Sequence, residues 1–332
     1  MTAAPIVPES GSSSAVCVTG MHRSGTSFVT GALRFLGVSL GDPARMLRPG
    51  PDNPKGYFEV QAIVQLDDEV LAHLGGAWDQ PPVLDSGWEL DPSLREFRSR
   101  ATEILDDTFG AEGRRPALIA WKDPRLSLLL PFWRTVTPIA TTIVVVRDPV
   151  EVAASLGARG YAVGASQAAS LWLRYLFAAI AADPAGLVVR HSDIFEDLPA
   201  TMARLATHLG LPQPDAGVET AVREHLDAGL RHHDAERASP ELGNPLLDLA
   251  RSIWNGGAHD AARVGPIVAD LVANGWLRPP LDGELLARAR ADVVKARETL
   301  RKTNLRVAKL EAELAARPPR ALPDDPGQPP AR

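Results

Sequence analysis

The chain has 332 residues, 45% of them hydrophobic, a formal net charge of −6 and one cysteine, Cys17. This composition supplies enough apolar residues for a substantial core. The acidic balance argues against a nucleic-acid-binding protein. A single cysteine excludes an internal disulfide framework and a cysteine-based zinc site. The sequence starts without the pattern of a signal peptide and has no apolar run near the ~20 residues that span a bilayer, so we expect a cytoplasmic protein without a transmembrane segment.

The first part of the chain reads as a strand, a glycine-bounded loop and a helix. Residues 1–14 are rich in Pro, Ser and Gly, and we expect them to be disordered. Val16 to Thr19 predict a buried strand, and residues 26–36 predict the helix after it. Residues 41–59 are dense in Pro and Gly and form a loop too long for a simple connector, which suggests a function for this loop.

Helices and strands then alternate up to about residue 210. We expect helices at 60–74, 92–108, 126–133, 166–182 and 198–209, and strands at 118–121, 141–147 and 186–190. The strand from 141 is the clearest, because it is β-branched and is cut off by Asp148-Pro149, where a helix should begin. Such alternation predicts an α/β fold with a parallel sheet covered on both faces.

The C-terminal part reads as helical only. We divide the chain into a core at 15–215, a helical extension at 216–282, a long helix at 283–316 and a proline-rich tail at 317–332. Within the long helix, residues 285–316 carry an apolar residue every seven positions, which predicts a coiled coil and a homodimer formed through it. A lone amphipathic helix folded onto the core explains the same pattern equally well.

The stretch "VCVTGMHRSGTSF", residues 16–28, has the layout of a phosphate-binding loop but lacks its lysine. Gly20 and Gly25 let the backbone curl so that successive N–H groups face inward, and the next helix adds its positive end. Ser24, Thr26 and Ser27 add hydroxyl groups, and Arg23 can replace the missing cation. The loop therefore predicts a site for phosphate or sulfate, without a metal ion.

A second signal lies at the end of the strand that starts at residue 141. Arg147 ends this strand, and Ser155 lies eight positions further, about two turns into the next helix. Both can face one anion at the carboxyl edge of the sheet. A salt bridge between Arg147 and Asp148 is the structural alternative.

Together the two signals resemble the sulfotransferase family that uses 3′-phosphoadenosine 5′-phosphosulfate (PAPS), and its bacterial branch most of all. In that family a Lys/Arg-Ser-Gly-Thr loop holds the 5′-phosphosulfate, and an Arg followed eight positions later by a Ser holds the 3′-phosphate. Arg23-Ser24-Gly25-Thr26 and the Arg147/Ser155 pair match both motifs. The resemblance covers about residues 15–211 and implies a P-loop NTPase-like three-layer fold with PAPS as co-substrate.

The chain also departs from the family pattern. The histidine base of the cytosolic small-molecule branch is absent after Lys122, and no clear basic glycine loop follows, since "LRHH" at 230–233 is a weak substitute. The aromatic residue that stacks on adenine would be Phe28, and His191 stands where a tyrosine is expected. The resemblance therefore supports anion binding more strongly than the identity of the nucleotide.

The resemblance assigns catalytic roles to four residues. Arg23 is the candidate for stabilising the bridging and leaving oxygens, and Lys122 is expected to assist it. Glutamate is the base in carbohydrate- and tyrosine-directed relatives, which makes Glu59 the natural candidate, with Asp123 as the alternative. Purely structural roles remain open: Lys122 paired to Asp123, and Glu59 as an acid at a helix N-terminus. His22 is a candidate for contact with the acceptor or the donor, although a loop histidine is more often simply exposed.

The expected reaction is in-line sulfuryl transfer from PAPS to a hydroxyl or amine of a carbohydrate, glycolipid or secondary metabolite. The competing hypothesis is a P-loop kinase-like phosphotransferase that uses a nucleotide triphosphate, because the loop differs little from the Gly-Lys-Thr form.

Overall fold

The computed structural model of the protein describes residues 13–50, 53, 56–84, 87–110, 116–161, 163–225 and 244–256. The chain divides into two units, 1–278 and 279–332, and every described residue lies in the first. The predicted coiled coil at 285–316, the dimer proposed through it, the tail and the "LRHH" segment lie outside the described residues.

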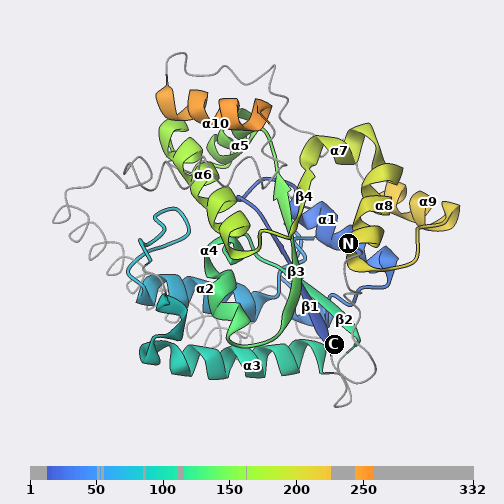
Figure 1. Ribbon diagram of the computed structural model, residues 1–332, viewed down its shortest axis with the longest axis horizontal. Coiled ribbons are helices and arrows are strands. Elements are labelled where there is room, and N and C mark those ends of the chain that lie inside the picture. The colour runs from blue at the N-terminus through green and yellow to red at the C-terminus, as the bar shows by residue number, and fades with distance from the viewer. Residues whose placement is uncertain are drawn as a thin grey trace, which may run out of the picture. The chain divides into compact units, whose positions relative to one another are not determined.

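The centre of the described part is a four-stranded sheet in which all strands are parallel (Figure 1). The strand order is β2-β1-β3-β4. The strands are β1 Ser14–Thr19, β2 Leu118–Lys122, β3 Ile139–Val146 and β4 Leu187–Arg190. Each strand is connected to the next strand along the chain by a crossover that contains helices, as parallel pairing requires. The carboxyl ends of the four strands therefore share one edge.

Helices cover both faces of the sheet, which confirms the predicted α/β fold. The helices are α1 Thr26–Leu33, α2 Gln61–His73, α3 Arg95–Phe109, α4 Leu126–Arg134, α5 Pro149–Gly157, α6 Ala165–Ala182, α7 His191–Glu196, α8 Leu198–Leu209, α9 Ala216–His225 and α10 Pro245–Asn255. Alternate residues of β1 point to opposite faces. Cys17 packs with α2 to α6 and α10, whereas Val16 and Val18 pack with α1 and α7 to α9.

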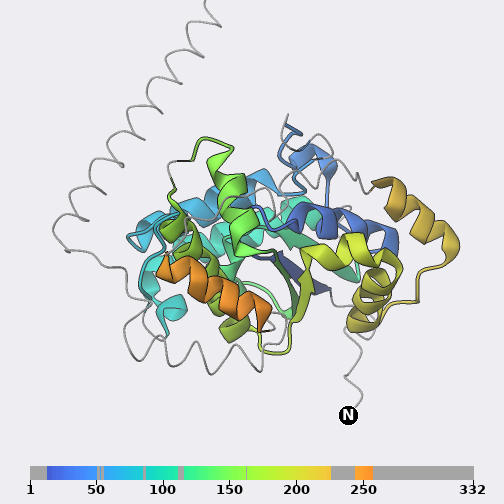
Figure 2. The same ribbon diagram turned by 90° about the horizontal axis from the view of Figure 1, so that it is seen from above.

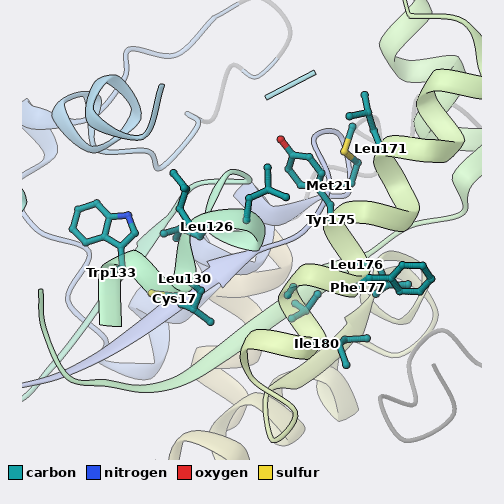
Figure 3. Close-up of a cluster of buried hydrophobic side chains, with 14 of the residues drawn as sticks. Cys17, Met21, Leu126, Leu130, Trp133, Leu171, Tyr175, Leu176, Phe177 and Ile180 are labelled. Atoms are coloured by element: carbon teal, nitrogen blue, oxygen red, sulfur yellow. The ribbon is translucent and has the colours of Figure 1, made fainter. Parts of the chain in front are cut away.

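The larger core lies under α4 and α6. Figure 3 shows Cys17 of β1 beside Leu130 of α4, and Tyr175 of α6 beside Met21 of the loop that follows β1. Trp121, Trp133 and Trp172 are at most 1% exposed in this core. α10 packs on α5 and α6, and α9 packs against α8 and α1 (Figure 2).

Element boundaries follow from local chemistry. Asp148 caps α5, since its Oδ1 accepts a hydrogen bond from Val150 N at 2.8 Å, and Pro149 occupies the first helical turn as predicted. The helix predicted at 92–108 begins only at Arg95, because Asp91 caps a separate 3₁₀ turn that contains Pro92. α1 ends at Leu33 and continues as a 3₁₀ turn to Leu36, so the predicted helix at 26–36 is of two kinds.

Candidate active site

The loop between β1 and α1 has the backbone that its glycines predict. Gly20 has φ 141°, and a Cβ there would lie 2.1 Å from the Val145 carbonyl oxygen. Gly25 has φ 88°, and a Cβ there would lie 2.4 Å from His191 Cδ2. Arg23, between them, also adopts a positive φ of 73°. The loop is therefore pressed against the ends of β3 and β4, in a conformation that side chains disfavour.

A cavity of about 390 Å³ lies at the carboxyl edge of the sheet and is lined from all four strand ends. It is bordered by Gly25 after β1, Lys122 of β2, Arg147 after β3 and His191 after β4. Among the described lining residues one is acidic, Glu59, and five are cationic: Arg23, Lys122, Arg125, Arg147 and Arg159. Such a cavity is suited to an anionic ligand.

Arg23 and the Arg147/Ser155 pair meet in one cluster. Arg23 Nε donates a hydrogen bond to Ser155 Oγ at 2.9 Å, and Arg147 Nη1 donates to the Arg23 carbonyl oxygen at 3.2 Å. Arg147 Nε also donates to Glu151 Oε2 at 2.6 Å, one turn along α5. Arg147 and Ser155 are 5% and 1% exposed, so the packing of the protein fixes their positions.

The arginines of this cluster repel one another. The pKa of Arg23 is lowered to about 10, first by burial and then by the positive charges of Arg159 and Arg147. Bringing like charges together in a partly buried place costs free energy, which an anion bound between them would offset. The clustering of guanidinium groups thus indicates a place for a phosphate or sulfate.

Lys122 forms a second polar group with Glu59 and Ser27. Lys122 Nζ makes a short salt bridge to Glu59 Oε1 and lies 3.4 Å from Ser27 Oγ at the start of α1. The Lys122 side chain is 2% exposed and the Glu59 side chain 13%. A carboxylate and an ammonium group therefore lie together at the β2 side of the cavity, beside the loop.

Asp123 does not line the cavity. It is fully buried and holds Arg125, which donates to it from its backbone N at 2.8 Å and from Nη1 at 3.0 Å. Burial raises the pKa of Asp123, and the charge of Arg125 opposes this shift. Arg125 also donates to both oxygens of Asp68, at 2.9 and 3.2 Å. Asp123 is thus part of a structural ion-pair network behind the site.

Two other residues expected to bind the anion do not line the cavity themselves. Ser24 is fully buried, and it borders a small void beneath the loop with Gly20 and Met21. Ser155 lies behind Arg23 and reaches the site through it. By contrast Gly25, Thr26 and Ser27 all border the cavity. The loop therefore presents its turn and the start of α1 to a ligand.

Five ring side chains, three of phenylalanine and two of histidine, border the same cavity. Phe28 and His225 of α9 are stacked, with their ring centroids 5.8 Å apart and an angle of 18° between the planes. Phe58 meets His225 edge-on at 5.7 Å, and His191 lies 5.0 Å from Phe195. All five side chains border the cavity. They offer flat ring surfaces suited to stacking with a nucleobase.

His22 is more buried than a loop histidine usually is. Its ring packs against Trp78 at 4.5 Å and Tyr175 at 5.9 Å. Its pKa is lowered well below the ordinary value, first by burial and then by the charges of Arg125 and Lys122. His22 Nε2 has no hydrogen-bond partner among the described residues. The imidazole is therefore neutral. Its ring is half-buried rather than exposed, and it borders the cavity.

No family model matches the chain, and no curated protein matches it. Three solved structures are similar to it: STF1 from Mycobacterium tuberculosis H37Rv, STF9 from Mycobacterium avium, and a domain of the Synechococcus PCC 7002 olefin synthase. All three are sulfotransferases. STF1 is 18% identical over 74% of this chain and 77% of its own, with a TM-score of 0.40. STF9 is 17% identical over 82% and 77%, at 0.39, and the Synechococcus domain 16% over 80% and 98%, at 0.36.

Several residues that border the cavity lie outside the motifs of the resemblance. Arg159 lies just beyond α5, and no motif marks it. Arg125, Tyr57 and Tyr161 also border the cavity, and no motif of the resemblance includes them. Spacing could have drawn attention to Arg159, because it lies one helical turn after Ser155.

The described residues contain no group of three or more His, Cys, Asp or Glu side chains arranged for a metal ion. Within the same part of the chain, no helix combines the length and the apolar character needed to cross a bilayer.

Proposed function

We propose that the protein is a sulfotransferase that transfers the sulfuryl group of PAPS to an acceptor hydroxyl. The observation that carries this proposal is the hydrogen bond from Arg23 to Ser155 at 2.9 Å, which joins the two motifs of the resemblance in one cluster. A kinase-type loop does not require a hydrogen bond between its cationic side chain and a serine of α5.

The charge and the volume of the cavity support PAPS as the donor. The cavity of about 390 Å³ lies within the range of small-molecule sites, roughly 300–1,000 Å³. We assign the 5′-phosphosulfate to the loop at Gly25 to Ser27, and the 3′-phosphate to Arg23 and Arg147, with Ser155 holding the Arg23 side chain in place. The adenine would lie on Phe28 and Phe195. Bound PAPS supplies an activated sulfuryl group and a stable leaving phosphate.

The residues of the β2 side would carry out the chemical step. Glu59 accepts the proton of the acceptor hydroxyl, and the acceptor oxygen bonds to sulfur. The bond between sulfur and the 5′-phosphate oxygen breaks, which leaves 3′-phosphoadenosine 5′-phosphate. We assign Lys122 to the charge that develops on the leaving oxygen, because its Nζ lies 3.4 Å from Ser27 Oγ at the loop. Arg23, expected in this role, donates a hydrogen bond from its Nε to Ser155, and we assign it to the 3′-phosphate.

Calorimetric titration of the full-length protein with 3′-phosphoadenosine 5′-phosphate tests the proposal. We expect saturable binding without added metal. A thermal-shift comparison with ATP and Mg²⁺ separates the alternative, because a kinase-like phosphotransferase would be stabilised by ATP·Mg²⁺ and not by the bisphosphate. Absence of binding of the bisphosphate would refute the sulfotransferase assignment.

A further inference from the structure

The β2 side of the cavity, where Glu59 meets Lys122, has an apolar wall. β2 is an edge strand of the sheet, so this side lies away from the arginine cluster at β3. Leu47 lies directly beside the carboxylate residue, since its backbone N donates to the Glu59 carbonyl oxygen at 2.8 Å. Val64 lies on the first turn of α2, and both side chains border the cavity.

These apolar side chains do not belong to the interior of the protein. Leu47 and Val64 are half-buried, and neither takes part in the two buried cores. On α2 the neighbouring Ile63 and the following Leu66 fill the core, whereas Val64 is turned away from it toward the cavity. Tyr57 also borders the cavity and lies outside both cores. An apolar surface left open inside a cavity is suited to an apolar ligand.

The polar groups at this end are already paired with one another. Glu59 is bound to Lys122, and Arg125 to Asp123 and Asp68. Among the described residues at this end, the neutral side chains that can form hydrogen bonds are Ser27, Asn53, Tyr57 and His22, fewer groups than a sugar ring presents. A sugar ring would place several hydroxyl groups against aliphatic carbon, and each unpaired group would weaken binding.

We infer that the acceptor is an uncharged hydrophobic alcohol or phenol, whose single reacting hydroxyl reaches Glu59 while its apolar skeleton contacts Leu47, Tyr57 and Val64. This inference rests on the proposed function and narrows the acceptor hydroxyl proposed there to one chemical class. The hydroxyl proton passes to Glu59, and the oxygen takes the sulfuryl group from PAPS.

The test compares acceptors and one nearly isosteric substitution in the full-length protein. With PAPS as donor, 2-naphthol, a cyclohexanol derivative, glucose and N-acetylglucosamine are assayed for release of 3′-phosphoadenosine 5′-phosphate. We expect kcat/KM for the hydrophobic acceptors to exceed that for the sugars by at least about tenfold, because unpaired sugar hydroxyls cost binding energy. A preference for the sugars, or failure of every hydrophobic acceptor while the bisphosphate still binds, would overturn the inference.

Val64→Thr keeps the volume of the side chain and replaces a methyl group by a hydroxyl. We expect it to raise KM for 2-naphthol about fourfold or more, the value of one buried methyl group, with kcat and bisphosphate affinity unchanged. Val83→Thr is the matched control, because Val83 is 71% exposed and does not border the cavity. An unchanged KM in Val64→Thr would contradict the inference. If the wild type does not bind the bisphosphate, the proposed function itself is refuted.

Discussion

Arg147 Nη1 donates a hydrogen bond to the carbonyl oxygen of Arg23 at 3.2 Å, which ties the end of β3 to the loop after β1. The backbone at Arg23 has a positive φ, so this bond also holds a conformation that is unfavourable for arginine. One side chain thus shapes the anion loop and supplies part of the charge of the site.

Replacing Arg147 should weaken nucleotide binding. We expect Arg147→Ala to raise the Kd of 3′-phosphoadenosine 5′-phosphate by about 10- to 100-fold, the value of a charge-assisted hydrogen bond. Arg147→Lys should have an intermediate Kd, because lysine keeps the charge but loses the planar fork. Calorimetry measures the affinities, and thermal melting verifies folding, since the substitution also removes a partner of the buried Glu151. Equal Kd values for wild type and Arg147→Ala would contradict the assignment.

Arg159 should contribute mainly to recognition of the 3′-phosphate. Its charge acts on Arg23 in the cluster that we assign to this phosphate. We expect Arg159→Ala to weaken binding of 3′-phosphoadenosine 5′-phosphate by about tenfold or more, and to change AMP binding little, because AMP lacks the 3′-phosphate. Arg100→Ala is the control: this exposed arginine pairs with Glu69 outside the cavity. Equal losses for both nucleotides would show that Arg159 acts elsewhere.

The two candidate bases should behave differently. We expect Glu59→Gln to lower kcat by about 10²- to 10⁴-fold, the usual contribution of general base catalysis, with bisphosphate affinity retained. Asp123→Asn should lower the melting temperature, because it weakens the buried contact to Arg125, and should change kcat less than Glu59→Gln does. Steady-state rates and melting curves of both variants decide the matter. A larger loss of kcat in Asp123→Asn than in Glu59→Gln would transfer the role of base to Asp123.

His22 should make the protein less stable in mild acid. Its pKa is lowered in the folded protein, whereas an unfolded histidine titrates near about 6.5. As the pH falls through that value, the unfolded chain binds a proton that the folded protein does not, so the free energy of unfolding decreases. We expect a smaller decrease in His22→Gln when urea unfolding is compared at about pH 7 and about pH 5.

The control for His22 is His73→Gln, because His73 is exposed. This variant shows how far the removal of a surface imidazole changes the pH dependence. If His22→Gln has the wild-type pH dependence, the imidazole of His22 is not held neutral by the fold.

Most strands and helices of the core could be predicted from the sequence. β-Branched runs with Gly or Asp-Pro at their ends marked β1 and β3, and the expected boundaries of α8 agree with the structure. α7 escaped prediction because it follows β4 directly, without a turn signal between them. The start of α3 was missed because Asp91 and Pro92 look like a helix start but form a separate turn.

The candidate site was only partly readable, because its geometry depends on contacts distant in the sequence. The motifs named Arg23, Arg147 and Ser155, but not the bond between Arg23 and Ser155. Glu59 and Asp123 looked equivalent as bases until the fold brought Glu59 to Lys122 and buried Asp123. The burial of His22 depends on Trp78, which lies in another loop. Arg159 has no motif around it and required the fold.

Under the proposed function, the salt bridge between Glu59 and Lys122 has a consequence for the timing of sulfuryl transfer. Once the carboxylate becomes a carboxylic acid, it no longer neutralises its neighbour. The ammonium group regains its full electrostatic strength at the moment when negative charge accumulates on the departing phosphate. Deprotonation of the nucleophile and stabilisation of the leaving group would then be two effects of one proton movement, and Lys122 would stay neutralised until an acceptor hydroxyl has given up its proton.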